Sequence, residues 1–344
     1  MNRILRTLLI AALLVSLCAY ASAETITYGS EHKTPIIIDR PGEDVTIKLN
    51  GVSISGSDSP AIKVNTANSL TIILVDGTYN YLYGDDSYSA IDNRQIPMTI
   101  TCESAGEGHT CDNSCGKLYA RGGYRSAGIG GSESRSSDAA NITIAGGNIT
   151  AGSSGYGAGI GGADLFGDAS NITISGGNVT ASGGTYGGVG IGSGSSADAS
   201  NIVISGGKVT ATGVGRHAGI GCGPNGSVSG ITISGGSIEA TGSNGGAGMG
   251  AGSEGSAENI VIAPKGVTGI EAKAGADASS ATALEGSPFT SGSTDITEQV
   301  ADQAFFQTRA ATPETGDGAN FVLWTSMLLL GAAALVLMKK RAHA

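Results

Sequence analysis

A motif of ten residues returns along this chain with a spacing of about 29–30 residues, and a fixed period of this kind indicates a solenoid of stacked repeats. Its first clear copy is Asn141-Ile-Thr-Ile-Ala-Gly-Gly-Asn-Ile-Thr, and further copies begin at Asn171, Asn201 and Gly230, with a degenerate one at Asn259. A second marker, Gly-Ile-Gly or Gly-Met-Gly, runs in phase with the first and is centred on Ile129, Ile160, Ile191, Ile220 and Met249.

Each repeat contains three short runs with strand character, separated by glycines. In the copy that begins at Asn171 we predict strands at 171–175, 178–181 and 189–191. Side chains alternate between the two faces of a strand. The expected inward residues are therefore Ile172, Ile174, Val179, Ala181, Val189 and Ile191, and the expected outward ones are Thr173 and Thr180. Such short strands bury enough surface only when coils stack and pair with one another. The sequence thus predicts an all-β parallel β-helix of about 7–8 coils.

The glycine content opposes the main alternatives to this fold. The chain has 58 glycines, and each costs a helix roughly 1 kcal/mol relative to alanine. Glycine pairs separate the first strand of a repeat from the second, where tight corners need positive φ; they begin at Gly146, Gly176, Gly206 and Gly235. A flexible glycine-serine tract would have no reason to keep aliphatic residues in phase, so the repeats indicate an ordered fold.

The N-terminus has the features of an export signal. Arg3 and Arg6 precede a short apolar run, and Ala21-Ser22-Ala23 offers the pattern that signal peptidase cleaves. We therefore predict a signal peptide at 1–23. N-terminal coils with a cysteine-containing insertion are expected at 24–115, repeat coils at 116–275, and a flexible stalk at 276–312.

The C-terminal segment, 313–344, has three parts in a fixed order. A motif made of Thr312, Pro313, Glu314, Thr315 and Gly316 comes first. An apolar stretch at 321–338, long enough to cross a membrane, follows it, and Lys339-Lys340-Arg341 forms a basic end. This order resembles the sortase sorting signal, with Thr312 where that family usually has Leu. The resemblance implies cleavage after Thr315 and attachment to peptidoglycan; a plain membrane anchor is the alternative.

The charge balance bears on partners. The chain has 19 basic and 29 acidic residues, and loss of both processed ends removes five basic residues and one acidic residue. The remaining chain, with a net charge of about −14, is unsuited to nucleic acid or to anionic membranes. We expect a monomer at the wall of a Gram-positive bacterium.

The N-terminal coils resemble a known family. The string Lys48-Leu-Asn-Gly-Val-Ser-Ile, then Pro60-Ala-Ile-Lys-Val, then Leu70-Thr-Ile-Ile-Leu-Val-Asp-Gly-Thr-Tyr is similar to the opening of a clostridial family of extracellular carbohydrate-binding β-helices. The resemblance covers about residues 40–260. It implies a right-handed parallel β-helix that binds calcium and a polysaccharide, but no individual binding residue carries over.

Acidic and aromatic residues in these coils are candidate ligand groups. Carboxylates near backbone carbonyls suit Ca²⁺, and the candidates are Asp76, Asp85, Asp86 and Asp92; turn formation is the alternative explanation. Tyr79, Tyr81 and Tyr83 would share one face of a strand and could stack on sugar rings. Ordinary packing is an equal alternative.

A second aromatic set precedes the Gly-Ile-Gly markers. Stacking would align Tyr124, Tyr156, Tyr186 and His217 in a ladder beside Arg125 and Arg216. Such a ladder would suit an acidic glycan through ring contacts and charge-assisted hydrogen bonds, or would simply close a corner.

The insertion carries Cys102, Cys111 and Cys115. Export favours disulfides, so we expect Cys102 to pair with Cys111 or Cys115. His109 in the same segment also permits a zinc site, although these spacings match no standard zinc pattern.

Taken together, these features favour a wall-anchored surface protein that displays a carbohydrate-binding or adhesive β-helix and is not an enzyme. A structural or protein-binding spacer is the first alternative, and a pectate-lyase-like polysaccharide lyase is the second. The sequence lacks the Gly-x-Ser-x-Gly and His-Glu-x-x-His motifs.

Overall fold

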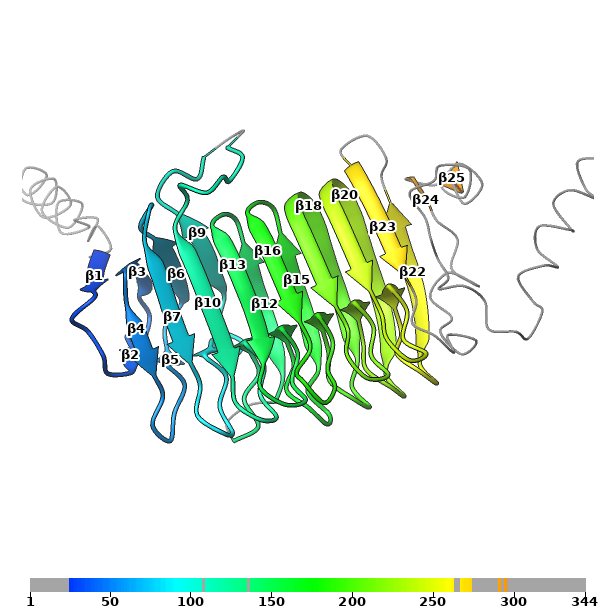
Figure 1. Ribbon diagram of the computed structural model, residues 1–344, viewed down its shortest axis with the longest axis horizontal. Helices are drawn as coiled ribbons and strands as arrows, with labels where there is room; N and C mark the ends of the chain where they lie inside the picture. The colour runs from blue at the N-terminus through cyan, green and yellow to red at the C-terminus, as the bar shows by residue number, and fades with distance from the viewer. Residues whose placement is uncertain are drawn as a thin grey trace, which may run out of the picture.

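The computed structural model describes residues 25–106, 109–134, 137–262 and 267–273, together with two short strands at 290–291 and 294–295. All regular secondary structure among these residues is β-strand. The strands stack in parallel into about eight coils that follow one another along the long axis of the molecule (Figure 1). The predicted all-β parallel solenoid is confirmed.

Each full coil contributes one strand to each of three faces. The first face contains β1 (Thr25–Gly29), β3 (Asp44–Asn50), β6 (Ser69–Leu74), β9 (Met98–Cys102), β12 (Ala139–Ile144), β15 (Ala169–Ile174), the first halves of β18 (Ala199–Thr212) and β20 (Ser227–Thr241), and β22 (Ser256–Ile262). The second contains β4 (Ser53–Ser55), β7 (Tyr79–Tyr83), β10 (Lys117–Gly122), β13 (Asn148–Ser153), β16 (Asn178–Ser182), the second halves of β18 and β20, and β23 (Val267–Lys273).

The third face is built from shorter strands and forms a sheet of its own. It contains β2 (Ile36–Asp39), β5 (Ile62–Thr66), β8 (Ile91–Asp92), β11 (Ile129–Gly130), β14 (Ile160–Gly161), β17 (Ile191–Gly192), β19 (Ile220–Gly221) and β21 (Met249–Gly250). From β8 onward each of these strands has two residues and corresponds to a Gly-Ile-Gly or related marker of the sequence.

Equivalent side chains from successive coils form the core. Ile142 is in register with Ile172, and Ile172 with Ile202. All six inward residues predicted for the copy at Asn171 are buried, whereas Thr173 and Thr180 are not. The core is therefore a stack of aliphatic side chains that no single coil could assemble.

The corners between the first two faces depend on left-handed backbone. In the glycine pairs it is the second residue that has positive φ, as at Gly177 (89°).

Asn171, predicted to start a strand, lies inside β15 with φ of 54° and is skipped in the pairing register. Its amide donates to Asn141 Oδ1 (3.0 Å) and its own Oδ1 accepts from Asn201 (2.7 Å). Asparagine tolerates this conformation better than most residues, and the amides of neighbouring coils satisfy one another.

The cysteine-bearing insertion interrupts one corner. Residues 103–116 separate β9 from β10, whereas only residues 145–147 separate β12 from β13 one coil later. The strands on both sides of the insertion keep their register, with Ile100 paired to Ile144 and Lys117 to Asn148. The inserted loop projects from the upper edge of the solenoid (Figure 1).

The predicted processing segments lie outside the described residues. These are the signal peptide at 1–23, the sorting motif at 312–316 and the apolar stretch at 321–338. Among the residues that are described, no helix is long and apolar enough to cross a membrane. Within the predicted stalk, β24 (Thr290–Ser291) pairs with β22, and β25 (Thr294–Asp295) pairs with β24, so this part of it contains strand.

Candidate functional site

An array of tyrosines covers the outer surface of β7 and β10. We call Tyr79, Tyr81, Tyr83 and Tyr119 the tyrosine strip. Burial alternates along β7, so that Asn80 and Leu82 are inside and the three tyrosines are outside. The side chains of Tyr79 and Tyr81 are 54% and 39% exposed. The Tyr119 ring centroid lies 6.2 Å from that of Tyr81 and 5.8 Å from that of Tyr83. Tyr81, Tyr119 and Tyr83 thus form a continuous aromatic surface, and Tyr79 lies next along the same face of β7.

Two cationic side chains lie on the strand next to these rings. The Lys117 Nζ atom lies 4.3 Å from the centroid of the Tyr79 ring and donates a hydrogen bond to its hydroxyl (2.7 Å). Arg121 is exposed and is paired in register with Tyr83. Aromatic faces with adjacent cations can contact the apolar face of a sugar ring and donate to its carboxylate or hydroxyl groups.

The strip continues along the solenoid as a row of polar side chains. Tyr119 is in register with Thr150, Thr150 with Thr180, and Thr180 with Thr210. Stacked strands lie about 4.8 Å apart, so the row presents an outward side chain at regular intervals. This surface is flat, rigid and elongated in the direction of the solenoid axis.

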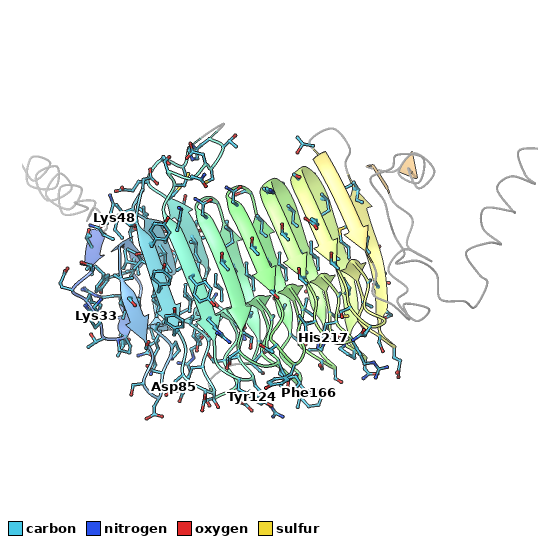
Figure 2. All side chains as sticks on the ribbon, in the orientation of Figure 1. Lys33, Lys48, Asp85, Tyr124, Phe166 and His217 are labelled. Atoms are coloured by element: carbon cyan, nitrogen blue, oxygen red, sulfur yellow. The ribbon has the colours of Figure 1, made fainter. Side chains whose placement is uncertain are left out.

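The second tyrosine set forms a compact cluster instead of an open ladder. The ring centroid of Tyr124 lies 5.3 Å from that of Tyr156 and 6.0 Å from that of Tyr186, and the last two are 5.7 Å apart. A hydrogen bond with Tyr156 raises the pKa of the Tyr124 hydroxyl. Tyr124 and the exposed Phe166 both lie at the lower edge of the solenoid (Figure 2). The rings of this cluster contact one another, while Tyr124 and Tyr186 remain 45% and 62% exposed.

His217 does not extend this cluster at the surface. It is only 6% exposed, and its ring nitrogens contact Val214 O (2.9 Å) and Ser195 Oγ (3.0 Å). Burial lowers its pKa to about 4. The expectation that His217 is a surface ligand group is therefore corrected: its imidazole fills a corner of the coil stack.

The two arginines predicted to flank the ladder are engaged in ion pairs. Arg125 lies 3.4 Å from Glu133 and 3.7 Å from Asp164. Arg216 lies 2.8 Å from Glu254. Exposed pairs of this kind are weak, so both guanidinium groups remain within reach of a competing anion.

The four candidate calcium ligands do not converge. Asp76 accepts a hydrogen bond from the Gly116 amide (3.1 Å) at the inserted loop, whereas Asp85 lies at the opposite edge (Figure 2). Bonds from the Asp58 and Asp86 amides lower the pKa of Asp85. Asp92 is buried and accepts from the Arg94 amide (2.9 Å). Within the described part of the chain, no group of three or more carboxylates gathers at one point, so these four acids do not form a single calcium site.

The cysteines of the insertion form a different kind of cluster. Cys102, His109, Cys111 and Cys115 each present one donor atom, and all four atoms lie within 4.8 Å of one another. Cys102, Cys111 and Cys115 are all free thiols in the structure, and the sulfurs of Cys102 and Cys111 are 3.8 Å apart, so neither predicted pairing, Cys102 with Cys111 or with Cys115, is formed there. Burial raises the pKa of Cys111 to about 12. For Cys115, burial also raises the pKa, but hydrogen bonds led by that of His109 bring it down to about 7.

A groove of about 790 Å³ runs beside this cluster. The inserted loop, with His109 and Cys111, forms one wall, and the corner glycines of the next coils, from Gly176 to Gly236, form the floor. Lys208 and Asn178 contribute polar groups. The inserted loop and the corner glycines of the repeat coils therefore line the same groove.

Sequence reasoning missed Tyr119 and Lys117. Both lie on β10, which the insertion separates from the first-face strand of its own coil, β9. A signal for them exists, because Leu118-Tyr119-Ala120 has the same inward-outward-inward pattern as Ile149-Thr150-Ala151, with which it pairs.

Comparison with known proteins agrees with this architecture. Residues 113–133, 142–164, 172–195, 202–224 and 231–253 match the family model described as Beta helix repeat. Comparison with curated proteins gives no match, and comparison with solved structures gives none. The five matched segments take the same place in successive coils. Each begins in or shortly before a strand of the first two faces and ends just after the Gly-Ile-Gly or Gly-Met-Gly marker. The chain is therefore a parallel β-solenoid in which these five segments match β-helix repeats.

Proposed function

We propose that this chain is a non-enzymatic glycan-binding protein of the Gram-positive cell surface, and that the tyrosine strip is its binding surface. The observation that carries the proposal is the exposed aromatic surface of β7 and β10, with Lys117 and Arg121 beside it. Large aromatic side chains that stay exposed on a rigid sheet indicate a binding surface, because their contact with water is unfavourable and they do not stabilise the core.

The chemistry of the strip favours an acidic polysaccharide. The chain as a whole is acidic, so a generally anionic ligand would be repelled by most of the surface. Lys117 and Arg121 locally reverse that sign, and Arg121 can hold a carboxylate through two parallel hydrogen bonds. A glycan that contains uronic acids would place its sugar rings on the tyrosines and its carboxylates on the two cations.

The scaffold favours this use of the strip. Its residues project from strands whose backbone amides pair with coils on both sides, as β10 does with β7 and β13. Residues held in this way lose little freedom on binding, and preorganisation of this kind lowers the cost of association. A long glycan would run along the solenoid axis, from the tyrosines onto the row of Thr150, Thr180 and Thr210.

The test is affinity electrophoresis of the purified chain in gels that contain polygalacturonate or a neutral glucan. We expect retardation by polygalacturonate, and the double variant Tyr81→Ala/Tyr119→Ala should weaken it by at least about tenfold, since each stacked ring contributes on the order of 1 kcal/mol. Thr143→Ala/Thr173→Ala, on the outer surface of the first face and away from the strip, is the matched control and should change binding less than threefold. Measurements with and without added calcium should agree.

Three results would contradict the proposal. Loss of binding in Tyr124→Ala/Tyr186→Ala, with the strip variant unaffected, would move the site to the other cluster. Absence of retardation by any glycan would favour a structural spacer. Accumulation of unsaturated sugar products from polygalacturonate would make the chain a lyase.

Attachment to the wall is the second part of the proposal. It rests on the sequence of the sorting motif at 312–316, which precedes an apolar stretch and a basic end. Replacement Thr315→Ala should prevent the transfer of the chain to peptidoglycan. We expect the variant to remain in the membrane fraction, whereas the wild-type chain is released from walls by a muralytic enzyme. Retention of both proteins in the membrane fraction would leave the plain membrane anchor.

A further inference from the structure

The inserted loop poses a structural problem that its hydrophobic contacts do not solve. The described residues of the segment 103–116 contain no strand, and most of their side chains are exposed. Loops of this length without secondary structure are uncommon unless something holds them in place. The residues that turn inward are cysteines: Cys102 is 2% exposed, Cys111 8% and Cys115 0%.

The donor atoms of these residues have the spacing of a tetrahedral metal site. Zinc binds thiolate sulfur at about 2.3 Å, so two sulfurs on one zinc ion lie about 3.8 Å apart. The Cys102 and Cys111 sulfurs are 3.8 Å apart. His109 Nε2 lies 3.1 Å from Cys115 Sγ, and no pair among the four donors exceeds 4.8 Å.

Surrounding groups orient these donors as an outer shell does in metal sites. The Gly147 amide donates a hydrogen bond to Cys111 Sγ (3.1 Å). The Asn148 side chain donates to the carbonyls of Asp112 (2.8 Å) and Cys115 (3.1 Å). Asn178, one coil further, donates to the Cys111 carbonyl (3.1 Å). The corner asparagines of two successive coils therefore hold the cysteine-bearing backbone against the solenoid.

A disulfide explains this arrangement less well than a metal. A disulfide requires its sulfurs to be about 2.05 Å apart and uses two thiols, which would leave the third buried cysteine and His109 without a role. Cys222, the remaining described cysteine, lies in a different coil and is fully buried. One ion, in contrast, uses all three thiols and the imidazole.

We propose that Cys102, His109, Cys111 and Cys115 bind a structural zinc ion that fastens the inserted loop to the corner of the solenoid. A set of three thiolates and one imidazole in tetrahedral positions suits zinc among the common metals. The four protein ligands fill the coordination shell, so the ion has no open position for catalysis. Its effect is to fix the loop that walls the groove beside the repeat coils.

The test measures zinc in the full chain. The protein is loaded with zinc under reducing conditions, freed of unbound metal, and analysed by elemental mass spectrometry. We expect about one zinc per chain. Replacement of the exposed ligand in His109→Ala should lower zinc affinity by at least about tenfold, in a competition with a chromophoric chelator. The control is His32→Ala, which changes a partly exposed histidine between β1 and β2.

Cobalt provides a readout of the ligand set. Co²⁺ in place of zinc should give the intense visible bands of a tetrahedral site together with sulfur-to-metal charge transfer. Cys111→Ser should reduce both, and Cys222→Ser should leave them unchanged. If Cys111→Ser fails to fold, addition of a chelator to the wild-type chain replaces it, and the cobalt bands should then disappear.

Thiol mapping distinguishes a zinc site from a disulfide. With zinc removed and no reductant present, alkylation and peptide mass spectrometry should find Cys102, Cys111 and Cys115 all modified. A protected pair among them in the exported protein would establish a disulfide and overturn the proposal. Retention of no zinc by the wild-type chain, or equal retention by His109→Ala, would overturn it as well.

Discussion

At the scale of single residues, this fold depends on side chains whose environment exists only in the stack. His217 illustrates the point, because its ring nitrogens contact Ser195 Oγ of the preceding coil and the carbonyl oxygen of Val214 in its own coil. Burial disfavours its charged form. A group of this kind links the stability of the solenoid to pH.

The pKa of His217 gives a stability prediction with a definite sign. The folded pKa of about 4 lies below the ordinary value of 6.5, so the unfolded chain binds the proton more readily. The contribution of His217 is therefore fully retained above pH 6.5 and is lost as the pH falls from 6.5 toward 4, by about 3 kcal/mol in total.

Urea unfolding at pH 7 and pH 4 measures this loss. His217→Gln keeps a polar side chain but does not titrate, so the decrease in unfolding free energy between the two pH values should be smaller in the variant by about 3 kcal/mol. An equal decrease in both proteins would show that His217 is not buried in solution.

At the scale of strands, the third face from β11 onward depends on the glycine that ends each short strand. Gly192 in β17 has φ of 138°, and a Cβ atom there would lie 1.8 Å from the Gly221 carbonyl oxygen of the next coil. Neither the backbone conformation nor the close approach of the coils leaves room for a side chain. These glycines set how tightly the coils stack on that face.

Replacement of this glycine should destabilise the fold sharply. We expect Gly192→Ala to lower the unfolding free energy by more than about 2 kcal/mol, because it adds both backbone strain and a steric clash. Gly152→Ala is the matched control, since its Cβ would meet only the Ser182 carbonyl oxygen at 3.5 Å. It should change stability by less than about 1 kcal/mol. Similar values for the two variants in denaturant titrations would contradict this account of the face.

At the scale of the whole molecule, a regular solenoid carries two irregular features. The tyrosine strip lies on β7 and β10, in the early coils. The inserted loop projects from the corner between β9 and β10 (Figure 1). The later coils are uniform and extend the same flat surface. We infer that the repeats supply rigidity and length, while the early coils supply chemistry.

Much of this fold could be predicted from the amino-acid sequence because the repeat imposes one solution on every coil. In-phase positions such as Ile142 and Ile172 predicted the inward faces, and Gly-Ile-Gly markers predicted the third strand. The location of Tyr79, Tyr81 and Tyr83 on one outward face followed from simple alternation. Each of these conclusions depends only on neighbours along the chain and on a constant period.

The candidate sites depend on contacts between coils, and these only the tertiary structure decided. It brought Cys102, His109, Cys111 and Cys115 together, placed Tyr119 against Tyr81, and buried His217. It also separated Asp76 from Asp85, which the sequence had grouped. The physical reason is that strand periodicity fixes which face a side chain takes, whereas the path of a loop and the offset between coils fix which other side chains it meets.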